Sequence, residues 1–126
     1  MIKGIGTDIL EIERLQRLDL ERLAFKILTE QEREKIPIKP HRRYEFLAGR
    51  FAAKEAIAKA FGTGIGQQVG WRDIEIIPNE KGQPQVRLSE RVQEQLIAGQ
   101  SYSIHLSISH SHGMAVAMAV WEIFDL

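Results

Sequence analysis

The spacing of apolar residues along the chain separates extended from helical segments. β-Branched residues interrupted by glycine fill positions 2–10, a pattern that predicts a strand. From position 11 to about position 28, apolar residues recur every three or four positions between charged ones, which predicts a helix. Thr29 followed by Glu32 is the signature of a capping box, so a short helix is predicted to begin there and to end before Pro37.

A long helix is predicted from near His41 to the glycine at position 62, because alanine, lysine and glutamate are frequent in it and no proline interrupts it. Its apolar residues do not form a single stripe, since one set shares a face with Glu55 and another lies roughly opposite. A helix that is apolar on several sides is typically buried. The first set is Tyr44, Ala48, Phe51 and Ala58, and the second is Phe46, Ala53 and Ile57.

The second half of the chain predicts strands joined by turns. Ser89 is placed to cap a short helix that Gly99 closes. The last strand is apolar on both faces, so we expect it to be central in its sheet and covered on both sides. Together these elements predict an α+β fold in which a mainly antiparallel sheet packs against the long helix. The predicted strands are residues 71–78, 84–88, 102–109 and 114–123, with turns at 79–82 and 111–113.

The composition indicates one globular domain spanning residues 1–126. Basic and acidic residues both number 17, so the net charge is zero, which argues against a general nucleic-acid-binding protein. The chain has no cysteine and therefore no disulfide framework and no thiolate ligand. No secretory signal is visible, and the longest apolar run, residues 114–121, is too short to cross a membrane. We expect a cytoplasmic protein with no membrane partner.

Glu55 is the first candidate for chemistry, because its helical neighbours are mostly apolar. A carboxylate on an apolar face is costly unless a cation meets it there. Lys59 follows one turn later at the favoured spacing for an ion pair, and such pairs are common on solvated helix faces. A metal ion is the alternative partner. The residues alone leave both interpretations open.

Asp8 supplies a second carboxylate. On the predicted first strand, it points to the same side as Gly4 and Gly6, whose missing side chains leave room for a bulky neighbour. Asp8 also suits a simple cap for the helix that follows. Two acids on apolar elements are typical of a Mg²⁺ site, because Mg²⁺ takes one or two carboxylates and completes its shell with water and substrate phosphates.

Other polar features are weaker signals. The glycines at positions 62, 64 and 66 follow a helix rather than precede one, so they lack the anion-binding helix N-terminus of a phosphate loop. His110 ends an apolar strand face, where a lone histidine is more often structural than catalytic. The four histidines do not have the spacing of zinc ligands.

Four sequence blocks, taken together, resemble one known family. They are GIGTDI at the start, FLAGRFAAKEAIAKAFGTGIG in the middle, DIEI with NEKGQP next, and LSISHSHGMAVA near the end. In this order and spacing, the chain resembles the holo-[acyl-carrier-protein] synthases, the short 4′-phosphopantetheinyl transferases. The resemblance implies that family's fold. It also implies transfer of 4′-phosphopantetheine from coenzyme A to a serine of apo-acyl carrier protein, leaving adenosine 3′,5′-bisphosphate.

The resemblance implies roles for the residues that match the family's motifs. Asp8 and Glu55 correspond to ligands of Mg²⁺, and Lys59 to a group beside the coenzyme A pyrophosphate. Either Glu55, through a water, or Asp8 is the candidate base for the serine proton. Further matches line the nucleotide part of the coenzyme A pocket: Arg50, Gly62, Gly64, Gly66, Lys81, Gly82, Pro84 and His110.

The resemblance also implies a homotrimer with active sites between subunits, which would cover the apolar last strand. The acidic carrier protein is expected on the first helix, although acidic neighbours dilute the positive charge of that face. The candidate docking residues are Arg14, Arg17, Leu18 and Arg22. Two other functions compete with the transferase. One is a coenzyme A or nucleotide-binding module without catalysis, and the other is a structural protein in which apolar strands drive assembly.

Overall fold

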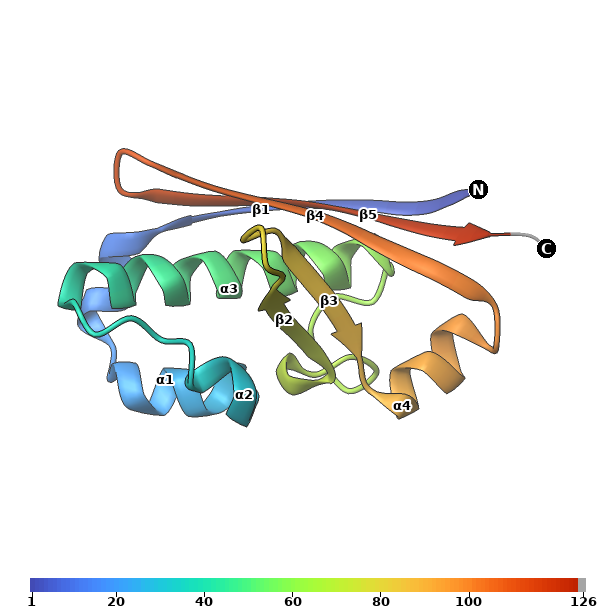
Figure 1. The fold of residues 1–126 in the computed structure, drawn as a ribbon, viewed down its shortest axis with the longest axis horizontal. Coiled ribbons are helices and arrows are strands. Elements are labelled where there is room, and N and C mark those ends of the chain that lie inside the picture. The colour runs from blue at the N-terminus through green and yellow to red at the C-terminus, as the bar shows by residue number, and fades with distance from the viewer. Residues whose placement is uncertain (125–126) are drawn as a thin grey trace.

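In the computed structural model, which describes residues 1–124, an antiparallel sheet lies along a long helix (Figure 1). The helix is α3 (Pro40–Ala60). The strands β1 (Ile2–Glu11), β5 (Met114–Phe124) and β4 (Ser101–Ser111) lie side by side in that order. This arrangement confirms the predicted α+β fold with an antiparallel sheet packed on the long helix.

Shorter elements lie mainly on the side of α3 that faces away from this sheet (Figure 1). A second sheet consists of β2 (Ile74–Pro78) and β3 (Pro84–Leu88), paired as an antiparallel hairpin. None of the helices in the described part of the chain is both long and apolar enough to cross a membrane. The remaining elements are the 3₁₀ helix η1 (Ile12–Arg17), α1 (Leu20–Ile27), α2 (Glu30–Arg33), the 3₁₀ turn η2 (Trp71–Asp73), α4 (Glu90–Val92) and the π-helical turn η3 (Gln93–Ile97).

Helix α3 is buried between these two layers, as its apolar pattern predicts. Pro40 occupies its first turn, where the missing N–H costs no hydrogen bond. Strand β1 of the three-stranded sheet approaches α3 closely, because β1 carries glycines at the contact. A Cβ atom on Gly4 would lie 1.8 Å from the carbonyl oxygen of Ala60, and one on Gly6 would lie 1.9 Å from that of Ala56. The bulky neighbour expected beside the two glycines is therefore the backbone of α3.

The single helix predicted between positions 11 and 28 is wrong, because the segment breaks in two. Leu18 is extended, and the Asp19 side chain then accepts hydrogen bonds from the backbone N–H groups of Glu21 and Arg22. This N-cap starts α1 as a new helix after η1. The break matters for function because it separates Arg14, on η1, from Arg22, on α1.

Other predicted boundaries shift by a few residues. The strand expected from Trp71 begins only at Ile74, because Trp71–Asp73 form a 3₁₀ turn. The capping box of Thr29 and the N-cap of Ser89 are confirmed. The last hairpin turns on two residues with positive φ, His112 and Gly113, rather than three. The short helix before β4 ends at Ala98, with φ 54°, one residue ahead of the predicted Gly99.

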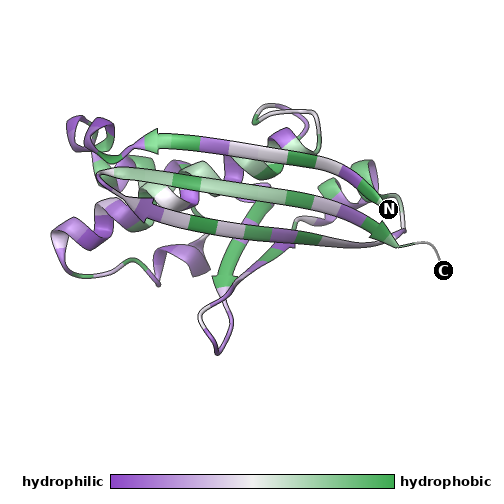
Figure 2. Ribbon diagram, turned by 90° about the horizontal axis from the view of Figure 1, so that it is seen from above, coloured by the Kyte–Doolittle hydropathy of each residue, from purple (hydrophilic) through white to green (hydrophobic). Residues whose placement is uncertain are grey.

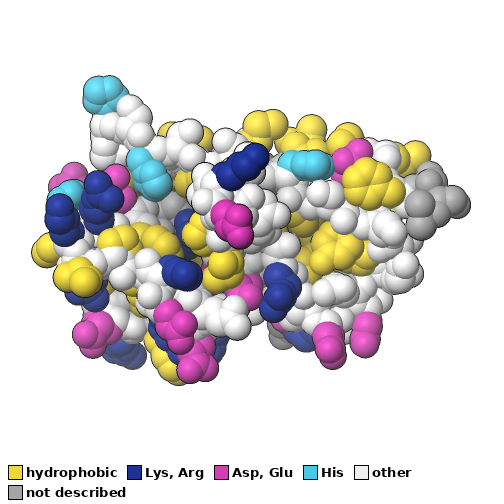
Figure 3. All heavy atoms as spheres, in the orientation of Figure 1, with side chains coloured by type: hydrophobic (Ala, Val, Ile, Leu, Met, Phe, Trp, Pro, Cys, Tyr) yellow, Lys and Arg dark blue, Asp and Glu magenta, His cyan; other side chains and the backbone are white. Residues whose placement is uncertain are grey.

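Strand β5 is central, as predicted, but the chain itself covers only one of its faces. The alanines at positions 115, 117 and 119 are buried in the core, while Val116 and Met118 point outward and are 40% and 47% exposed. Ile5 and Ile9 of β1 extend this apolar surface. Figure 2 shows the outer face of the strands with no other element over it, and Figure 3 shows hydrophobic side chains along that edge of the molecule.

Candidate active site

Three side chains predicted for chemistry, Asp8, Glu55 and Lys59, lie together where β1 crosses α3. Lys59 Nζ donates to the Asp8 carboxylate at 3.2 Å and to the Thr7 carbonyl oxygen at 3.0 Å. The close approach of β1 to α3 at Gly6 sets this geometry, since Asp8 follows two residues later on the same side of the strand.

The ion pair within the helix, weighed as the ordinary explanation of Glu55, is not present. Lys59 pairs with Asp8 of the neighbouring strand, and no ion pair within 4.0 Å joins Lys59 to Glu55. Lys59 itself is half-exposed, which leaves its ammonium accessible to a ligand.

Glu55 is only partly buried, but its surroundings disfavour its charge. Loss of hydration raises the pKa of the Glu55 carboxyl above its ordinary value, and the negative charge of Asp8 raises it further. Lys59 opposes these effects and does not cancel them. The cluster therefore holds more negative charge than Lys59 alone compensates, and it favours a further cation.

The donors present fit Mg²⁺. Asp8 and Glu55 offer carboxylate oxygens, the ligands that this hard ion prefers, and they leave several coordination positions for water and phosphate. Among residues 1–124 no group of three or more His, Asp or Glu side chains is placed to hold a metal ion by itself.

Arg50 carries an unsatisfied buried donor. Its Nε atom is buried and has no hydrogen-bond partner among residues 1–124, while its guanidinium lies 4.4 Å above the ring of Phe46. Burial lowers the pKa of Arg50, and the negative charge of Glu32 opposes that effect. Because buried donors are nearly always satisfied, the free Nε indicates a place for an acceptor such as a phosphate oxygen.

His110 lies at the opposite edge of the sheet from Asp8. Its Nε2 atom is 2.9 Å from the carbonyl oxygen of Glu45, and it fits only because position 49 is glycine: a Cβ there would lie 2.9 Å from the ring nitrogen. The imidazole lines a surface pocket with His41, Tyr44 and Ser111. Since β5 lies between β1 and β4, the chain does not bring His110 and Asp8 into one pocket.

The glycine loop and the β2–β3 turn are open surface elements. Gly62 and Gly64 have positive φ, and a Cβ on Gly62, Gly64 or Gly66 would meet nothing within 4 Å. Gly62 and Gly64 therefore serve the backbone conformation of the loop, and none of the three glycines is required for close packing. Lys81 and Gly82 lie in the exposed turn, and Pro84 borders a groove beside β4.

The predicted docking residues Arg14, Arg17, Leu18 and Arg22 are all exposed. Leu18 and Arg22 line a surface groove with Leu23 and Lys26, just beyond the break between η1 and α1. Leu18 is 52% exposed, so it offers an apolar contact beside the basic side chains.

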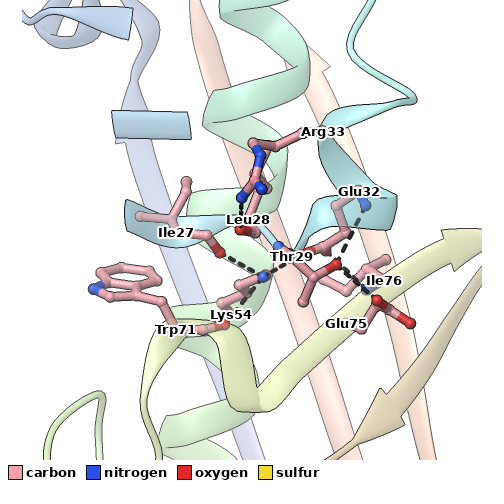
Figure 4. A network of polar contacts seen from close by, with 9 residues as sticks. All are labelled: Ile27, Leu28, Thr29, Glu32, Arg33, Lys54, Trp71, Glu75 and Ile76. Carbon is pink, nitrogen blue, oxygen red and sulfur yellow. Dashed lines mark hydrogen bonds and ion pairs between the residues drawn. The ribbon is translucent and has the colours of Figure 1, made fainter. Parts of the chain in front are cut away.

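One polar pair was missed from the sequence. Glu32 and Lys54 are both fully buried and form an ion pair of 2.6 Å between α2 and α3 (Figure 4). The available signal was the position of Lys54 among alanines on a helix predicted to be buried.

Comparisons with known proteins find relatives over nearly the whole chain. Residues 4–120 match the model of the 4′-phosphopantetheinyl transferase superfamily. The holo-[acyl-carrier-protein] synthase of Geobacillus sp. (strain WCH70) is 46% identical over 97% of this chain and 98% of its own, and that of Bacillus cereus (strain ATCC 14579) is 47% identical over 97% of both.

Solved structures of such synthases have the same fold. The enzyme from Bacillus anthracis, in complex with CoA (3′,5′-ADP), is 44% identical and matches with a TM-score of 0.83 over 96% of both chains. The enzyme from Neisseria meningitidis is 38% identical, with a TM-score of 0.85 over 97% of this chain and 99% of its own. The chain therefore belongs to the holo-[acyl-carrier-protein] synthase family of 4′-phosphopantetheinyl transferases.

Proposed function

We propose that the protein transfers 4′-phosphopantetheine from coenzyme A to a serine of apo-acyl carrier protein, and that residues 1–126 act as one transferase domain. The serine oxygen forms a bond to the phosphorus that carries the pantetheine, the pyrophosphate bond breaks, and adenosine 3′,5′-bisphosphate leaves. The observation that carries the proposal is the cluster of Asp8, Glu55 and Lys59, found in a chain that matches synthases over 97% of its length.

Asp8 and Glu55 are the residues that would hold Mg²⁺. When bound, the ion would neutralise charge on the pyrophosphate and polarise the phosphorus under attack. Lys59 is placed to stabilise the departing phosphate, because its half-exposed ammonium already lies between β1 and α3. Glu55, acting through a water, or Asp8 would take the proton of the serine hydroxyl as the general base.

We infer that the nucleotide is bound between subunits of a homotrimer. The free Nε of Arg50 and the His110 pocket offer contacts for phosphate and nucleotide, yet His110 lies at the far edge of the sheet from Asp8. In the trimer, edge strand β1 of one subunit, which carries Asp8, would lie next to edge strand β4 of another subunit, which carries His110. A neighbouring copy would also cover the apolar outer face of β1 and β5. The glycine loop, Lys81, Gly82 and Pro84 would line the rest of the pocket.

The acyl carrier protein would dock on η1 and α1. Arg14 and Arg22 would meet its acidic side chains, and Leu18 would supply an apolar contact between them. Because rim charges act mainly on association rate, replacing Arg14 and Arg22 is expected to raise KM for the carrier protein more than it lowers kcat.

The direct test is the mass of apo-acyl carrier protein after incubation with the enzyme and coenzyme A. The proposal expects the mass to rise by one phosphopantetheine. A thermal shift with coenzyme A but no change in carrier-protein mass would favour the binding module without catalysis. No thermal shift and no mass change would favour the structural protein.

A further inference from the structure

The buried pair of Glu32 and Lys54 is fully connected by hydrogen bonds (Figure 4). Lys54 Nζ donates to Glu32 Oε1 at 2.6 Å, to the Ile27 carbonyl oxygen at 2.6 Å and to the Trp71 carbonyl oxygen at 3.0 Å. These contacts use all three hydrogens of the ammonium. Its acceptors come from α1, α2 and η2, so three separate segments are tied to one residue of α3.

Both carboxylate oxygens of Glu32 also accept hydrogen bonds. Its Oε1 atom also accepts from the Thr29 backbone N–H at 2.8 Å, and its Oε2 atom accepts from the Ile76 N–H of β2 at 2.9 Å. Thr29 in turn donates its hydroxyl to Glu75 at 2.7 Å. The network therefore connects the layer below α3, including the β2–β3 sheet, to the helix that carries the active-site residues.

Stability alone does not explain this pair. A buried ion pair is often no more stabilising than apolar residues of the same volume, because both charges lose their hydration. Burial lowers the pKa of Lys54 in the same way, and Glu32 opposes this effect. Beyond any contribution to stability, the pair forms directional hydrogen bonds. These bonds keep good geometry at only one rotation of α3 about its axis.

A directional contact matters for α3 because, beside the larger Leu47 and Ile57, most of its fully buried apolar residues are small. Fully buried alanines lie at positions 48, 52, 53, 56 and 58. Alanine side chains interdigitate little, so they restrict rotation of a helix about its axis less than larger ones do.

We propose that the Glu32–Lys54 pair is a positioning element of the active site, which fixes the rotation of α3 and thereby the direction of Glu55. Glu55 follows Lys54 directly and lies about 100° further around the helix axis. With side chains reaching about 5–6 Å from the axis, a rotation of about 10° displaces a carboxylate by about 1 Å. A misplacement of that size is sufficient to lower a rate about 10²-fold. The inference rests on the role of Glu55 in the proposed function.

The test uses the double variant Lys54→Met with Glu32→Gln. It removes both buried charges together, so neither is left uncompensated and the fold is expected to persist. We expect kcat to fall at least about 10-fold, with a smaller change in KM for coenzyme A. We also expect weaker Mn²⁺ binding by calorimetry in the presence of coenzyme A, a readout that does not require turnover.

Arg91→Met is the matched control. It removes a partly exposed ion pair, between Arg91 and Asp73, whose side chains do not hydrogen-bond to Glu32, Lys54 or α3. It is expected to lower the unfolding temperature and to leave kcat and Mn²⁺ binding unchanged. Lys54→Gln with Glu32→Gln is the second variant, should the first double variant not fold. It also leaves no buried charge, keeps a polar side chain at both positions and is expected to show the same losses to a smaller degree.

Either double variant, if folded and with the kcat and Mn²⁺ affinity of the unaltered protein, would overturn the proposal. Failure of the proposed function is recognised separately. If the unaltered protein turns over without a divalent ion, the metal role of Asp8 and Glu55 is wrong, whereas a fall of kcat in the double variant would still support positioning.

Discussion

At the scale of single residues, the two acids and the lysine that the sequence singled out do meet in the structure. The partner of Lys59 was not predictable, because helical spacing offers Glu55 and only the fold brings Asp8 within 3.2 Å. The burial of Lys54 was not predicted, because a lysine in an alanine-rich helix usually lies on a solvated face. Its burial depends on acceptors that come from distant segments.

Replacing Lys59 tests its role toward the leaving phosphate. Lys59→Ala is expected to lower kcat by roughly 10²-fold, because the variant loses a charge that acts where negative charge develops. Coenzyme A binding is expected to weaken less. Steady-state kinetics alongside calorimetric binding of coenzyme A separate the two effects. An unchanged kcat with weaker binding alone would contradict the assigned role.

Replacing Glu55 is expected to separate stability from activity. The folded pKa of Glu55 lies above its ordinary value of 4.5, so the native state holds this proton more tightly than the unfolded state. Stability attributable to Glu55 is thus present below pH 4.5 and is lost as pH rises through the folded pKa. In chelator, Glu55→Gln should gain stability relative to the unaltered protein between pH 4.5 and neutrality, yet lose activity.

Thermal unfolding across this pH range, followed with chelator present, measures that difference. A Gln variant that became relatively less stable as pH rose would show that Glu55 is favourably paired in the metal-free protein. That result would argue against the surplus of negative charge described for the site.

At the scale of elements, hydrophobic periodicity predicted the long helix and the strands, because their apolar faces are continuous over many residues. The break at Leu18 and Asp19 was not predicted, since the apolar spacing continues through it and only the cap of Asp19 marks it. The π-helical turn before β4 has no comparable sequence signal. The apolar pattern of β5 did not show that the outer face of this strand would be left uncovered within a single chain.

The contact of β1 with α3 is the element-scale feature on which the site depends. Gly6→Ala places a Cβ atom 1.9 Å from the Ala56 carbonyl oxygen, so the strand must move away from the helix. We expect a loss of about 1–3 kcal/mol in the free energy of unfolding. The folded fraction should also lose activity, because Asp8 moves with the strand. Denaturant unfolding and kinetics measure both.

Gly66→Ala is the control for stability, because a Cβ at that position meets nothing within 4 Å. Its unfolding free energy should stay within about 0.5 kcal/mol of the unaltered protein. Equal stability of the Gly6→Ala and Gly66→Ala variants would show that β1 tolerates displacement and that the glycine contact is not needed.

At the scale of the whole molecule, the outer sheet face and the separated site residues both indicate assembly. Met118 and Val116 are exposed at the centre of an apolar surface. The homotrimer stays a prediction, as does the cytoplasmic location expected from the sequence. The substitution Met118→Glu places a charge on this face and is expected to convert trimer to monomer in sedimentation experiments.

Loss of assembly should abolish activity, because Asp8 and His110 would no longer share a site. Mixing the Asp8→Asn and His110→Ala enzymes, each inactive alone, should restore part of the activity. Some mixed trimers would contain a site in which the unaltered Asp8 of one subunit meets the unaltered His110 of another. A fully active monomer of Met118→Glu, or no restoration on mixing, would contradict sites shared between subunits.

The central claim is that Asp8 and Glu55 hold a divalent ion used in phosphopantetheine transfer. The most direct measurement is the mass of apo-acyl carrier protein after incubation with coenzyme A and enzyme, with Mg²⁺ or with chelator. We expect the mass of one phosphopantetheine to be added only with Mg²⁺, and not by Asp8→Asn or Glu55→Gln under either condition. Full conversion in chelator, or by both variants, would contradict the account.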